Sequence, residues 1–470
     1  MKKNVLLLFL SFSLFGTAQQ ITLKKGAIID GIHVTDSVAE TFAVYLPKAF
    51  EMTKKWPVLF VYDTKGRGKQ VISMFREAAE DQGYILAASN NINDSLTLSK
   101  NVLISSRMFN TLFAMVPVQE NRLYTGGYTA GARLASLMPT FIKKVKGVIS
   151  CGSPVANSEV LSSKNPFHFV GIVGIEDYNY TSMLRTEKVL NKLRFPNNLL
   201  IFQGGQEWPS TKYISKAMEL LTLGLMANGE LDKDSTFIDT SYRKSLGEIS
   251  SLITANQPLL ADKLLKEMTE SYRLLRNVDS LKTSSKTLRK TRQFRSANRT
   301  LNAVLFRESL IKEDYVYYLE EDVLTYNYNN LGWWKYQIEK LQEYEKKPSI
   351  YEKQSGRRLK GFVNALIADQ IDIVKAETPV DEEALNFLWM VNTITDVESY
   401  QSYLNVISYS AKIEDYGTAL YYLEELLKNG YTDQETLYAL EHTALFRIMP
   451  EFNKVMVKYL KDARYDLIEQ

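Results

Sequence analysis

The sequence predicts an α/β domain built on a mostly parallel sheet, followed by an all-helical domain. In the first half of the 470-residue chain, short apolar runs bounded by turn residues alternate with helical stretches. These runs are continuous rather than alternating, which is typical of strands buried on both faces of a helix-covered sheet. After about residue 230, glycines become scarce and long polar segments with helical periodicity take over. We therefore expect an α/β domain at 19–230 and a helical domain at 231–470.

Six apolar runs are the predicted buried strands. They span residues 58–62, 84–88, 123–127, 147–150, 169–173 and 199–202. An earlier run, 41–46, stops at Pro47, and proline lacks the N–H group that a central strand donates to its neighbour. We expect this earlier run to be an edge strand.

The last 60 residues predict helical hairpins. A helix opens at Tyr416 and ends at Asn429-Gly430, a second is predicted from Asp433 to Phe446, and a third follows Pro450. Aromatic residues in the first helix and the Pro-x-Phe start of the third make 411–465 resemble a tetratricopeptide-type unit. Much of 235–470 is therefore expected to be a solenoid of helical hairpins, a fold that binds protein partners on its concave surface.

The N-terminus predicts export. Lys2 and Lys3 precede an apolar run, and the small residues of Gly16-Thr17-Ala18 form a cleavage site after Ala18. A membrane anchor is the alternative, but the run is shorter than the roughly 20 apolar residues that span a bilayer. No cysteine lies near the site, which argues against a lipid anchor. We expect a signal peptide at 1–18, no direct membrane span, and a periplasmic or secreted protein with a partner in the cell envelope.

Composition excludes several classes of function. Removing residues 1–18 takes two of the 57 Lys and Arg side chains and none of the 54 acidic ones, which leaves a net charge of +1 and no indication of nucleic acid as a partner. Cys151 is the only cysteine, so no intrachain disulfide forms. Three scattered histidines and one cysteine do not predict a metal site, and no glycine-rich nucleotide motif is present. We expect no cofactor.

Two features of the helical half allow two interpretations each. Residues 281–300 carry seven basic side chains and no acidic one, which indicates either a docking face for an anionic partner or, more commonly, a solvated helix face. Trp333-Trp334 and the Tyr-rich stretch 326–328 are either an exposed interaction patch or core residues. We favour the core, because aromatics at helical spacing usually pack inward.

The stretch 124–133, Tyr-Thr-Gly-Gly-Tyr-Thr-Ala-Gly-Ala-Arg, is the most informative in the chain. It follows a predicted strand and enters a predicted helix. Its segment Gly127 to Gly131 has the layout of the G-x-S-x-G nucleophile elbow, with Thr129 in place of serine. In such a turn the central side chain stands at the head of a helix, where backbone N–H groups stabilise an anion.

Residues 22–225 resemble α/β hydrolases of the esterase, dienelactone hydrolase-like and polyhydroxybutyrate depolymerase-like kind. The resemblance is carried by Gly127, Gly131, Ala132 and Arg133 of the elbow. It implies a catalytic acid at Asp177, in the loop 174–180. It implies a catalytic histidine in the segment 204–209, Gly-Gly-Gln-Glu-Trp-Pro, where this chain has Gln206. Thr129, Asp177 and Gln206 follow the nucleophile, acid, histidine order of that fold.

The same resemblance places an oxyanion pocket around the segment 63–68. Gly66 and Gly68 permit a turn that aims backbone N–H groups at an anion, and Ala130, Glu207 and Trp208 complete the expected pocket. Lys65 and Arg67 add positive charge. Either the pocket binds a carboxylate or acyl-like group without cleaving it, or the loop has drifted. We favour drift.

The altered triad predicts a protein that does not catalyse hydrolysis. Gln206 has no basic nitrogen to take a proton from Thr129, and the threonine methyl crowds a turn built for serine. Losing one triad member costs about 10⁴ to 10⁶ in rate. His33, His168 and His442 lie outside the loop that needs a base, and His168 is expected to be a structural residue at a strand start. The alternative is an active ester or acyl hydrolase with Thr129 as nucleophile and Glu207 as base.

Overall fold

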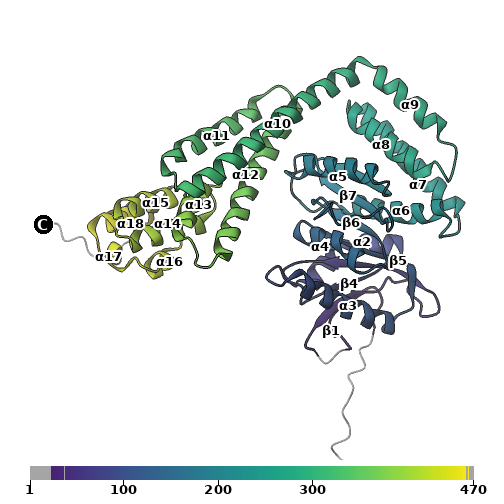
Figure 1. Cartoon of the computed structure of the whole chain (residues 1–470), viewed down its shortest axis with the longest axis horizontal. Helices are drawn as coiled ribbons and strands as arrows, with labels where there is room; N and C mark the ends of the chain where they lie inside the picture. The colour runs from purple at the N-terminus through teal and green to yellow at the C-terminus, as the bar shows by residue number, and fades with distance from the viewer. Residues whose placement is uncertain (1–22, 36–37, 462–463, 465–470) are drawn as a thin grey trace, which may run out of the picture. The chain divides into compact units, whose positions relative to one another are not determined.

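A computed structural model describes residues 23–35, 38–461 and 464 (Figure 1). The predicted signal peptide lies outside these residues. The chain forms two compact units. The first contains the described residues up to Gly174, Ser182–Phe202 and Glu207–Leu288, and the second contains Ile175–Thr181, Gln203–Gln206 and the chain from Arg289 onward. The change in composition near residue 230 coincides with the end of a helix at Asn228, whereas the first unit continues to Leu288.

The first unit is built on an eight-stranded sheet in the order β1-β2-β4-β3-β5-β6-β7-β8. β2 is antiparallel to both of its neighbours, and the pairs from β4 to β8 are parallel. The strands are β1 (Ile28–His33), β2 (Thr41–Tyr45), β3 (Trp56–Tyr62), β4 (Ile85–Ser89), β5 (Val118–Tyr128), β6 (Val145–Cys151), β7 (His168–Gly174) and β8 (Asn197–Phe202).

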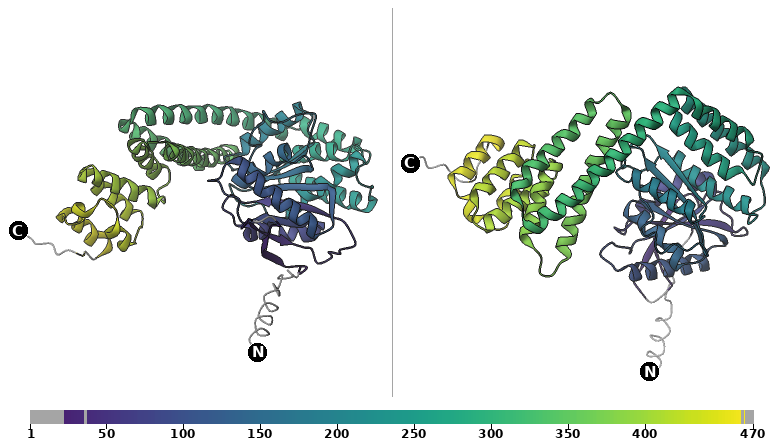
Figure 2. Two further views of the ribbon diagram at one scale, coloured as in Figure 1. Left: turned by 60° about the horizontal axis from the view of Figure 1, so that its bottom comes forward. Right: turned by 45° about the horizontal axis from the view of Figure 1, so that its top comes forward.

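Helices cover both faces of the sheet (Figure 2). The helices between strands are α2 (Gly68–Gln82), α3 (Leu98–Met115), α4 (Ala130–Phe141) and α5 (Tyr180–Lys192), and α6 (Thr211–Asn228) follows the last strand, β8. Side chains of α2 and α6 share one apolar cluster with the sheet. On the opposite face, Phe109 of α3 stacks on Phe60 of β3, and Thr125 of β5 donates a hydrogen bond to the Ala135 carbonyl of α4.

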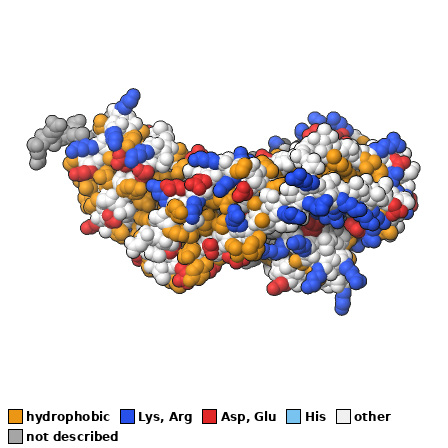
Figure 3. All heavy atoms as spheres, turned by 90° about the horizontal axis from the view of Figure 1, so that it is seen from above, with side chains coloured by type: hydrophobic (Ala, Val, Ile, Leu, Met, Phe, Trp, Pro, Cys, Tyr) orange, Lys and Arg blue, Asp and Glu red, His pale blue; other side chains and the backbone are white. Residues whose placement is uncertain are grey.

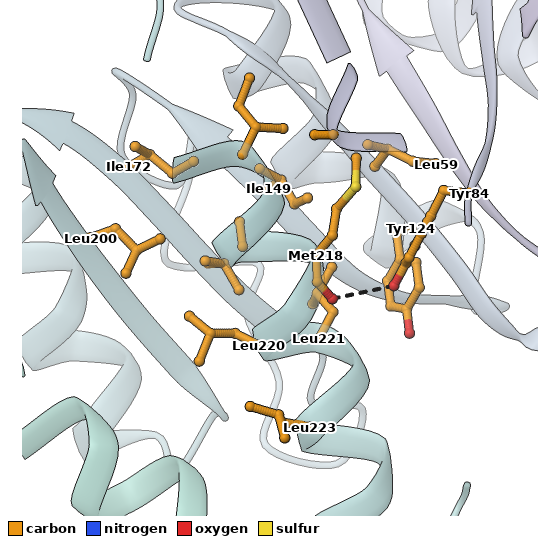
Figure 4. Close-up of a cluster of buried hydrophobic side chains, with 14 of the residues drawn as sticks. Leu59, Tyr84, Tyr124, Ile149, Ile172, Leu200, Met218, Leu220, Leu221 and Leu223 are labelled. Carbon is orange, nitrogen blue, oxygen red and sulfur yellow. Dashed lines mark hydrogen bonds between the residues drawn. The ribbon is translucent and has the colours of Figure 1, made fainter. Parts of the chain in front are cut away.

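The core of this unit lies between the sheet and α6 (Figure 4). Leu59, Ile149 and Ile172 come from three different strands and approach Met218 and Leu221 of the helix. Each buried side chain of this size contributes about 1.5–3 kcal/mol relative to the exposed state. The buried Tyr84 hydroxyl donates a hydrogen bond to the Met218 carbonyl at 3.4 Å. The predicted continuous apolar runs therefore form the sheet because both of their faces are covered.

One strand prediction was wrong. The run 41–46 forms β2, but β2 is not an edge strand, because β1 pairs with it on one side and β4 on the other. β1 was not predicted. Its sequence, Ile-Ile-Asp-Gly-Ile-His, is only partly buried and contains the turn-forming pair Asp30-Gly31, so it lacks the apolar run that marks the other strands.

Three further helices follow, α7 (Ser235–Thr254), α8 (Pro258–Tyr272) and α9 (Asp279–Lys290), and the first unit ends within α9, at Leu288. Glu267 of α8 accepts hydrogen bonds from the Asn198 side chain at 2.5 Å and from the Leu199 backbone at 3.4 Å. These contacts attach α8 to the start of β8.

The second unit is all-helical apart from its two loops. Its elements are α10 (Arg292–Thr325), η1 (Tyr328–Asn330), α11 (Leu331–Glu343), η2 (Tyr344–Lys346), α12 (Ile350–Ala376), α13 (Glu382–Thr395), α14 (Tyr400–Lys412), α15 (Tyr416–Lys428), α16 (Gln434–Ala439), α17 (Ala444–Arg447) and α18 (Pro450–Leu460). Two apolar clusters hold them together, one from α10 to α13 and one from α13 to α18.

One helix prediction for the helical half was wrong. The single helix predicted from Asp433 to Phe446 is two short helices, α16 and α17. The backbone turns extended at Leu440 and left-handed at His442, and the Thr443 hydroxyl bonds the Leu440 carbonyl at 2.7 Å. This local side-chain hydrogen bond competes with continuation of the helix.

The structure decides one of the two ambiguous features in part: Trp334 belongs to the core, whereas Tyr326 is 36% exposed. Trp334 is fully buried, and its indole N–H donates to Asp322 at 2.9 Å. The seven basic side chains of 281–300 lie exposed on α9 and α10, which is compatible with either interpretation of this run.

Candidate functional site

The turn between β5 and α4 has the geometry of a nucleophile elbow. Thr129 is the single residue between the strand and the helix, with φ 46° and ψ −115°. A β-branched residue rarely adopts positive φ, and such a conformation costs on the order of 1–3 kcal/mol. Its N–H donates to the Cys151 carbonyl of β6 at 2.9 Å, and its carbonyl accepts from the Arg133 N–H at 3.0 Å. Hydrogen bonds on both sides thus hold the strained residue in place.

Two glycines make this turn possible. A Cβ atom on Gly131 would lie 2.1 Å from the Tyr62 carbonyl oxygen at the end of β3. A Cβ atom on Gly127 would lie 2.6 Å from the Gly131 backbone. No side chain fits at either position. The G-x-x-x-G spacing read from the sequence is therefore a packing requirement of the elbow.

Asp177 is buried in the loop that follows β7. It is 2% exposed, and its Oδ1 accepts a hydrogen bond from the Asn179 N–H at 2.8 Å. Burial raises the pKa of Asp177 to about 6, while this hydrogen bond and the charge of Lys312 oppose the shift. A strongly shifted pKa is common at functional sites, but the acid of a triad acts in its ionised form, which this burial disfavours.

The loop 175–181 is held by helices α10 and α12 of the second unit. The Arg358 guanidinium, fully buried, donates to the Ile175 carbonyl at 2.7 Å and to the Glu308 carboxylate at 2.6 Å. Lys312 donates to the Tyr178 carbonyl at 3.2 Å and to the Thr181 hydroxyl at 3.1 Å, and it pairs with Glu308 at 3.0 Å.

This arrangement makes the acid loop part of the helical unit. Hydrogen bonds from Arg358 to the loop's first backbone carbonyl and from Lys312 to its last side chain fix the loop at both ends. The Glu308 carboxylate forms ion pairs with both Lys312 and Arg358. The pKa of Glu308 is lowered even though burial raises it, because its hydrogen bonds and charge interactions with Arg358 and Lys312 prevail.

Gln206 occupies the position that the resemblance gives to histidine. It is exposed, and its Nε2 donates to the Tyr178 hydroxyl at 3.3 Å. The Glu176 N–H bonds the Gly204 carbonyl at 2.9 Å, so the loop of Gln206 and the loop of Asp177 are joined directly. Gln206 therefore contributes an amide that bridges two loops, and an amide has no basic nitrogen to accept a proton.

Trp208 and Glu207 differ in their surroundings. Trp208 stacks on Tyr128 with ring centroids 4.5 Å apart and packs edge-on against Phe75 at 6.0 Å. It thus supports the residue that precedes Thr129. Glu207 is exposed.

The predicted oxyanion loop bonds internally. Asp63 accepts hydrogen bonds from the Lys65 N–H at 2.8 Å and from Arg67 at 2.6 Å, and its backbone carbonyl accepts the Gly66 N–H at 3.3 Å. Burial raises the pKa of Asp63, but the hydrogen bonds from Arg67 and Lys65 outweigh it and lower the pKa. Two N–H groups of this loop are therefore directed at Asp63.

The two glycines of the loop serve packing. A Cβ atom on Gly66 or Gly68 would lie 2.5 Å from Asn90, just beyond β4. The N–H group of Ala130, the first residue of α4, remains the candidate oxyanion donor that the elbow itself supplies.

The three histidines are placed elsewhere. His168 begins β7, at the end of the sheet opposite to the elbow, and its Nε2 lies 2.8 Å from the Asn198 side chain. Burial lowers the pKa of His168. His33 ends β1, four strands from β5 in the sheet order, which is roughly 19 Å at 4.8 Å per strand. His442 lies in the turn between α16 and α17.

Sequence reasoning missed the cluster of Glu308, Lys312 and Arg358. Glu308 and Lys312 have the spacing of an i, i+4 pair on a helix, but nothing in the sequence linked them to a loop more than 120 residues earlier. Within residues 23–35, 38–461 and 464, no group of His, Cys, Asp and Glu side chains is arranged to hold a metal ion. No helix in this described part combines the length and apolarity needed to cross a membrane.

Comparison with known proteins gives structural neighbours only. No protein-family model matches the sequence, and no curated protein sequence matches it. Among solved structures, the chain is similar to an acetyl ester-xyloside bifunctional hydrolase from Caldicellulosiruptor lactoaceticus, with 15% identity, a TM-score of 0.35 and coverage of 43% of this chain and 98% of that chain. An esterase from Pyrobaculum calidifontis gives 10% identity, a TM-score of 0.35 and coverage of 43% and 86%.

An acylaminoacyl peptidase from Pyrococcus horikoshii gives 14% identity, a TM-score of 0.32 and coverage of 43% of this chain and 42% of that chain. All three matches fall in the N-terminal part. The strand order, the antiparallel β2 and the elbow after β5 are the observations that identify the architecture. The N-terminal part of the chain has the α/β-hydrolase fold, and an all-helical region follows it.

Proposed function

We propose that this chain is an exported protein of the α/β-hydrolase fold that no longer catalyses hydrolysis and serves as a binding or scaffold component of the bacterial cell envelope. The observation that supports this most directly is Gln206. It stands where a histidine base is required, and its amide bonds Tyr178. Without a base, the hydroxyl of Thr129 stays protonated and is a poor nucleophile.

The environment of Asp177 supports the same proposal. In a working triad the acid orients a histidine by accepting its N–H. Here the loop that carries Asp177 is fixed by Arg358 and Lys312 of the helical unit. The α/β domain then acts as a folded recognition module. The helical hairpins supply the surface for a protein partner, as solenoids of this kind do.

A second candidate is an active ester or acyl hydrolase, with Thr129 as nucleophile and Glu207 as base. The strained backbone of Thr129 favours it, because residues held in such conformations cluster at functional sites. The exposure of Glu207 favours it less, since a side chain surrounded by water is not held in position against the hydroxyl that it would deprotonate.

Turnover of short-chain nitrophenyl esters by the purified mature protein separates the two candidates. The proposal predicts that wild type and Thr129→Ala have the same background rate. Thr129→Ser/Gln206→His supplies the missing groups and is the positive control for the rest of the site. Turnover by the wild type that is lost in Thr129→Ala would establish the hydrolase and end the proposal.

Labelling with a serine- and threonine-directed phosphonate gives an independent readout. A non-catalytic domain is not labelled, since the hydroxyl of Thr129 lacks a base. An active hydrolase is labelled in the wild type and in Glu207→Asp, and not in Thr129→Ala.

A further inference from the structure

Helix α10 exposes a stripe of large apolar side chains. Four residues carry it, with exposed fractions of 67% for Phe306, 46% for Leu310, 59% for Tyr317 and 76% for Leu324. They are four, seven and seven residues apart, so they share one face of the helix. On the face of the molecule seen in Figure 3, hydrophobic side chains reach the surface of the helical unit between charged ones.

The opposite face of α10 is already packed. Val304, Tyr315 and Leu319 are buried on that side, and the last two belong to the apolar cluster that α10 shares with α11, α12 and α13. The stripe is thus not needed for the fold of its own unit. Single exposed apolar residues are ordinary, whereas several on one face of a helix mark an interaction surface.

The exposed charges of α10 are divided between its two halves. The first half, 292–307, carries four exposed arginines and no acid: Arg292, Arg295, Arg299 and Arg307. The second half carries four exposed carboxylates: Glu313, Asp314, Glu320 and Glu321. The helix dipole has the same sense, with its positive end at the N-terminus.

We propose that α10 is a dimerisation helix that pairs antiparallel with α10 of a second copy of this chain. A surface that is complementary to itself is what a two-fold interface requires, because both subunits contribute the same patch. Antiparallel pairing brings the arginine half of each helix against the carboxylate half of the other. Parallel pairing would set like charges together, so the charge pattern selects the antiparallel arrangement.

Full overlap of the two helices fixes the register. The two-fold axis then passes near residue 308, the midpoint of Arg292–Thr325. Phe306 of each copy faces Leu310 of the second copy across the axis, which gives the interface an apolar centre. Farther out, Arg299 faces Tyr317 of the second copy, whose neighbours along the helix are carboxylates on both sides. Arg295 lies alongside Glu320 and Glu321 of the second copy. This pairing does not depend on whether Thr129 reacts.

Sedimentation equilibrium of the full mature chain tests the dimer. We expect the wild type to dimerise and Phe306→Glu/Leu310→Glu to dimerise at least about tenfold more weakly, since it places charges at the centre of the interface. Met52→Glu is the matched control, because Met52 is 61% exposed in the first unit and lies outside the stripe. Circular dichroism verifies that each variant is folded. A monomeric wild type, or a folded Phe306→Glu/Leu310→Glu variant that dimerises like the wild type, overturns the proposal.

Charge reversal tests the antiparallel register. In the proposed register, Arg295→Glu/Arg299→Glu sets new acidic side chains beside the carboxylates of the second copy, and Glu320→Lys/Glu321→Lys sets new basic side chains beside its arginines. Each variant alone is expected to be monomeric, and an equimolar mixture is expected to form a heterodimer. A mixture that stays monomeric contradicts the antiparallel pairing, because a merely unfolded helix is excluded by the circular dichroism of each variant.

Discussion

At the scale of single residues, Thr129 holds a conformation that its side chain disfavours. Its φ and ψ lie in a region that glycine adopts easily and that a β-branched residue rarely adopts. The strain is maintained by the hydrogen bond to Cys151 and by the fit of Gly131 against Tyr62. The turn therefore keeps the shape of an elbow at the expense of folding free energy, whether or not the threonine takes part in chemistry.

Glycine at position 129 should relieve that strain. We expect Thr129→Gly to unfold at higher urea concentration than Thr129→Ala, by about 1 kcal/mol in the free energy of unfolding, because only glycine adopts this conformation without penalty. Ser250 is the control position, since it is exposed and lies within α7, four residues before the helix ends. There the order should reverse, with alanine more stable than glycine by about 1 kcal/mol. The same order at both positions would show that Thr129 is not strained.

Asp177 should make stability depend on pH. The folded protein binds its proton more tightly than the unfolded chain does, since burial raises the pKa from 3.8 to about 6. Ionisation of Asp177 therefore destabilises the fold above pH 6, by on the order of 2 to 3 kcal/mol, and this penalty disappears as the pH falls below 4. Asp177→Asn keeps the acceptor for the Asn179 N–H and removes the titration.

Urea unfolding of wild type and Asp177→Asn at several pH values checks this expectation. The stability advantage of Asp177→Asn should be largest above pH 6 and should shrink between pH 6 and pH 4. A difference that is constant over this range would mean that the pKa of Asp177 is not raised.

At the scale of elements, the buried group of Glu308, Lys312 and Arg358 joins α10, α12 and the loop 175–181. Removing one partner of a buried ion pair leaves the other charge uncompensated, which costs about 3–5 kcal/mol, whereas replacing the pair by apolar residues costs much less. We expect Arg358→Met to destabilise the helical unit by about that amount. Glu308→Leu/Arg358→Met should recover a large part of the loss.

Amide hydrogen exchange measures the local effect of the same variants. Arg358→Met should increase exchange in residues 175–181, because the Ile175 carbonyl loses its donor. Equal losses in the single and double variants would show that the charges do not act as a group. Arg357→Met is the matched control, since Arg357 pairs with Glu176 and Glu345 on the surface and surface pairs contribute little.

The strands were predictable and the contacts of the acid loop were not. Runs such as 169–173 are continuous because both faces of the sheet are covered, so local sequence is sufficient to find them. β1 was not predicted, because a half-exposed edge strand needs no apolar run. The contact between Arg358 and Ile175 links residues 183 positions apart, and neither residue type marks it in advance.

At the scale of the whole molecule, the predicted signal peptide at 1–18 implies that the mature chain is shorter than the translated one. The N-terminus of the protein recovered from an expressing bacterium should be Gln19, as read by N-terminal sequencing or intact mass. Ala18→Phe should block processing, because the peptidase needs a small residue at that position. An unprocessed wild-type chain retained in the cytoplasm would contradict both the signal peptide and the envelope role.

The candidate site could be located from sequence only at its elbow. Glycines are informative there because their positions are fixed by close backbone approach, as for Gly131. The contacts of the predicted oxyanion loop could not be predicted from the sequence. Its two glycines pack against Asn90, and two of its N–H groups donate hydrogen bonds to Asp63. Gly66 and Gly68 indicate a close approach of neighbouring atoms, but the sequence does not show that Asn90 makes it.

The division of the chain into units has a consequence for modularity. The chain passes between the two units five times, because the loops 175–181 and 203–206 interrupt the first unit and belong to the second. The helical region is therefore not an independent domain that a single cut at Leu288 would release intact. Such a cut separates two loops from the helices that complete them, and the detached helices would keep Glu308 and Arg358 with no carbonyl from Ile175 to bind. Recombination or limited proteolysis at that point would yield two incomplete surfaces rather than two domains.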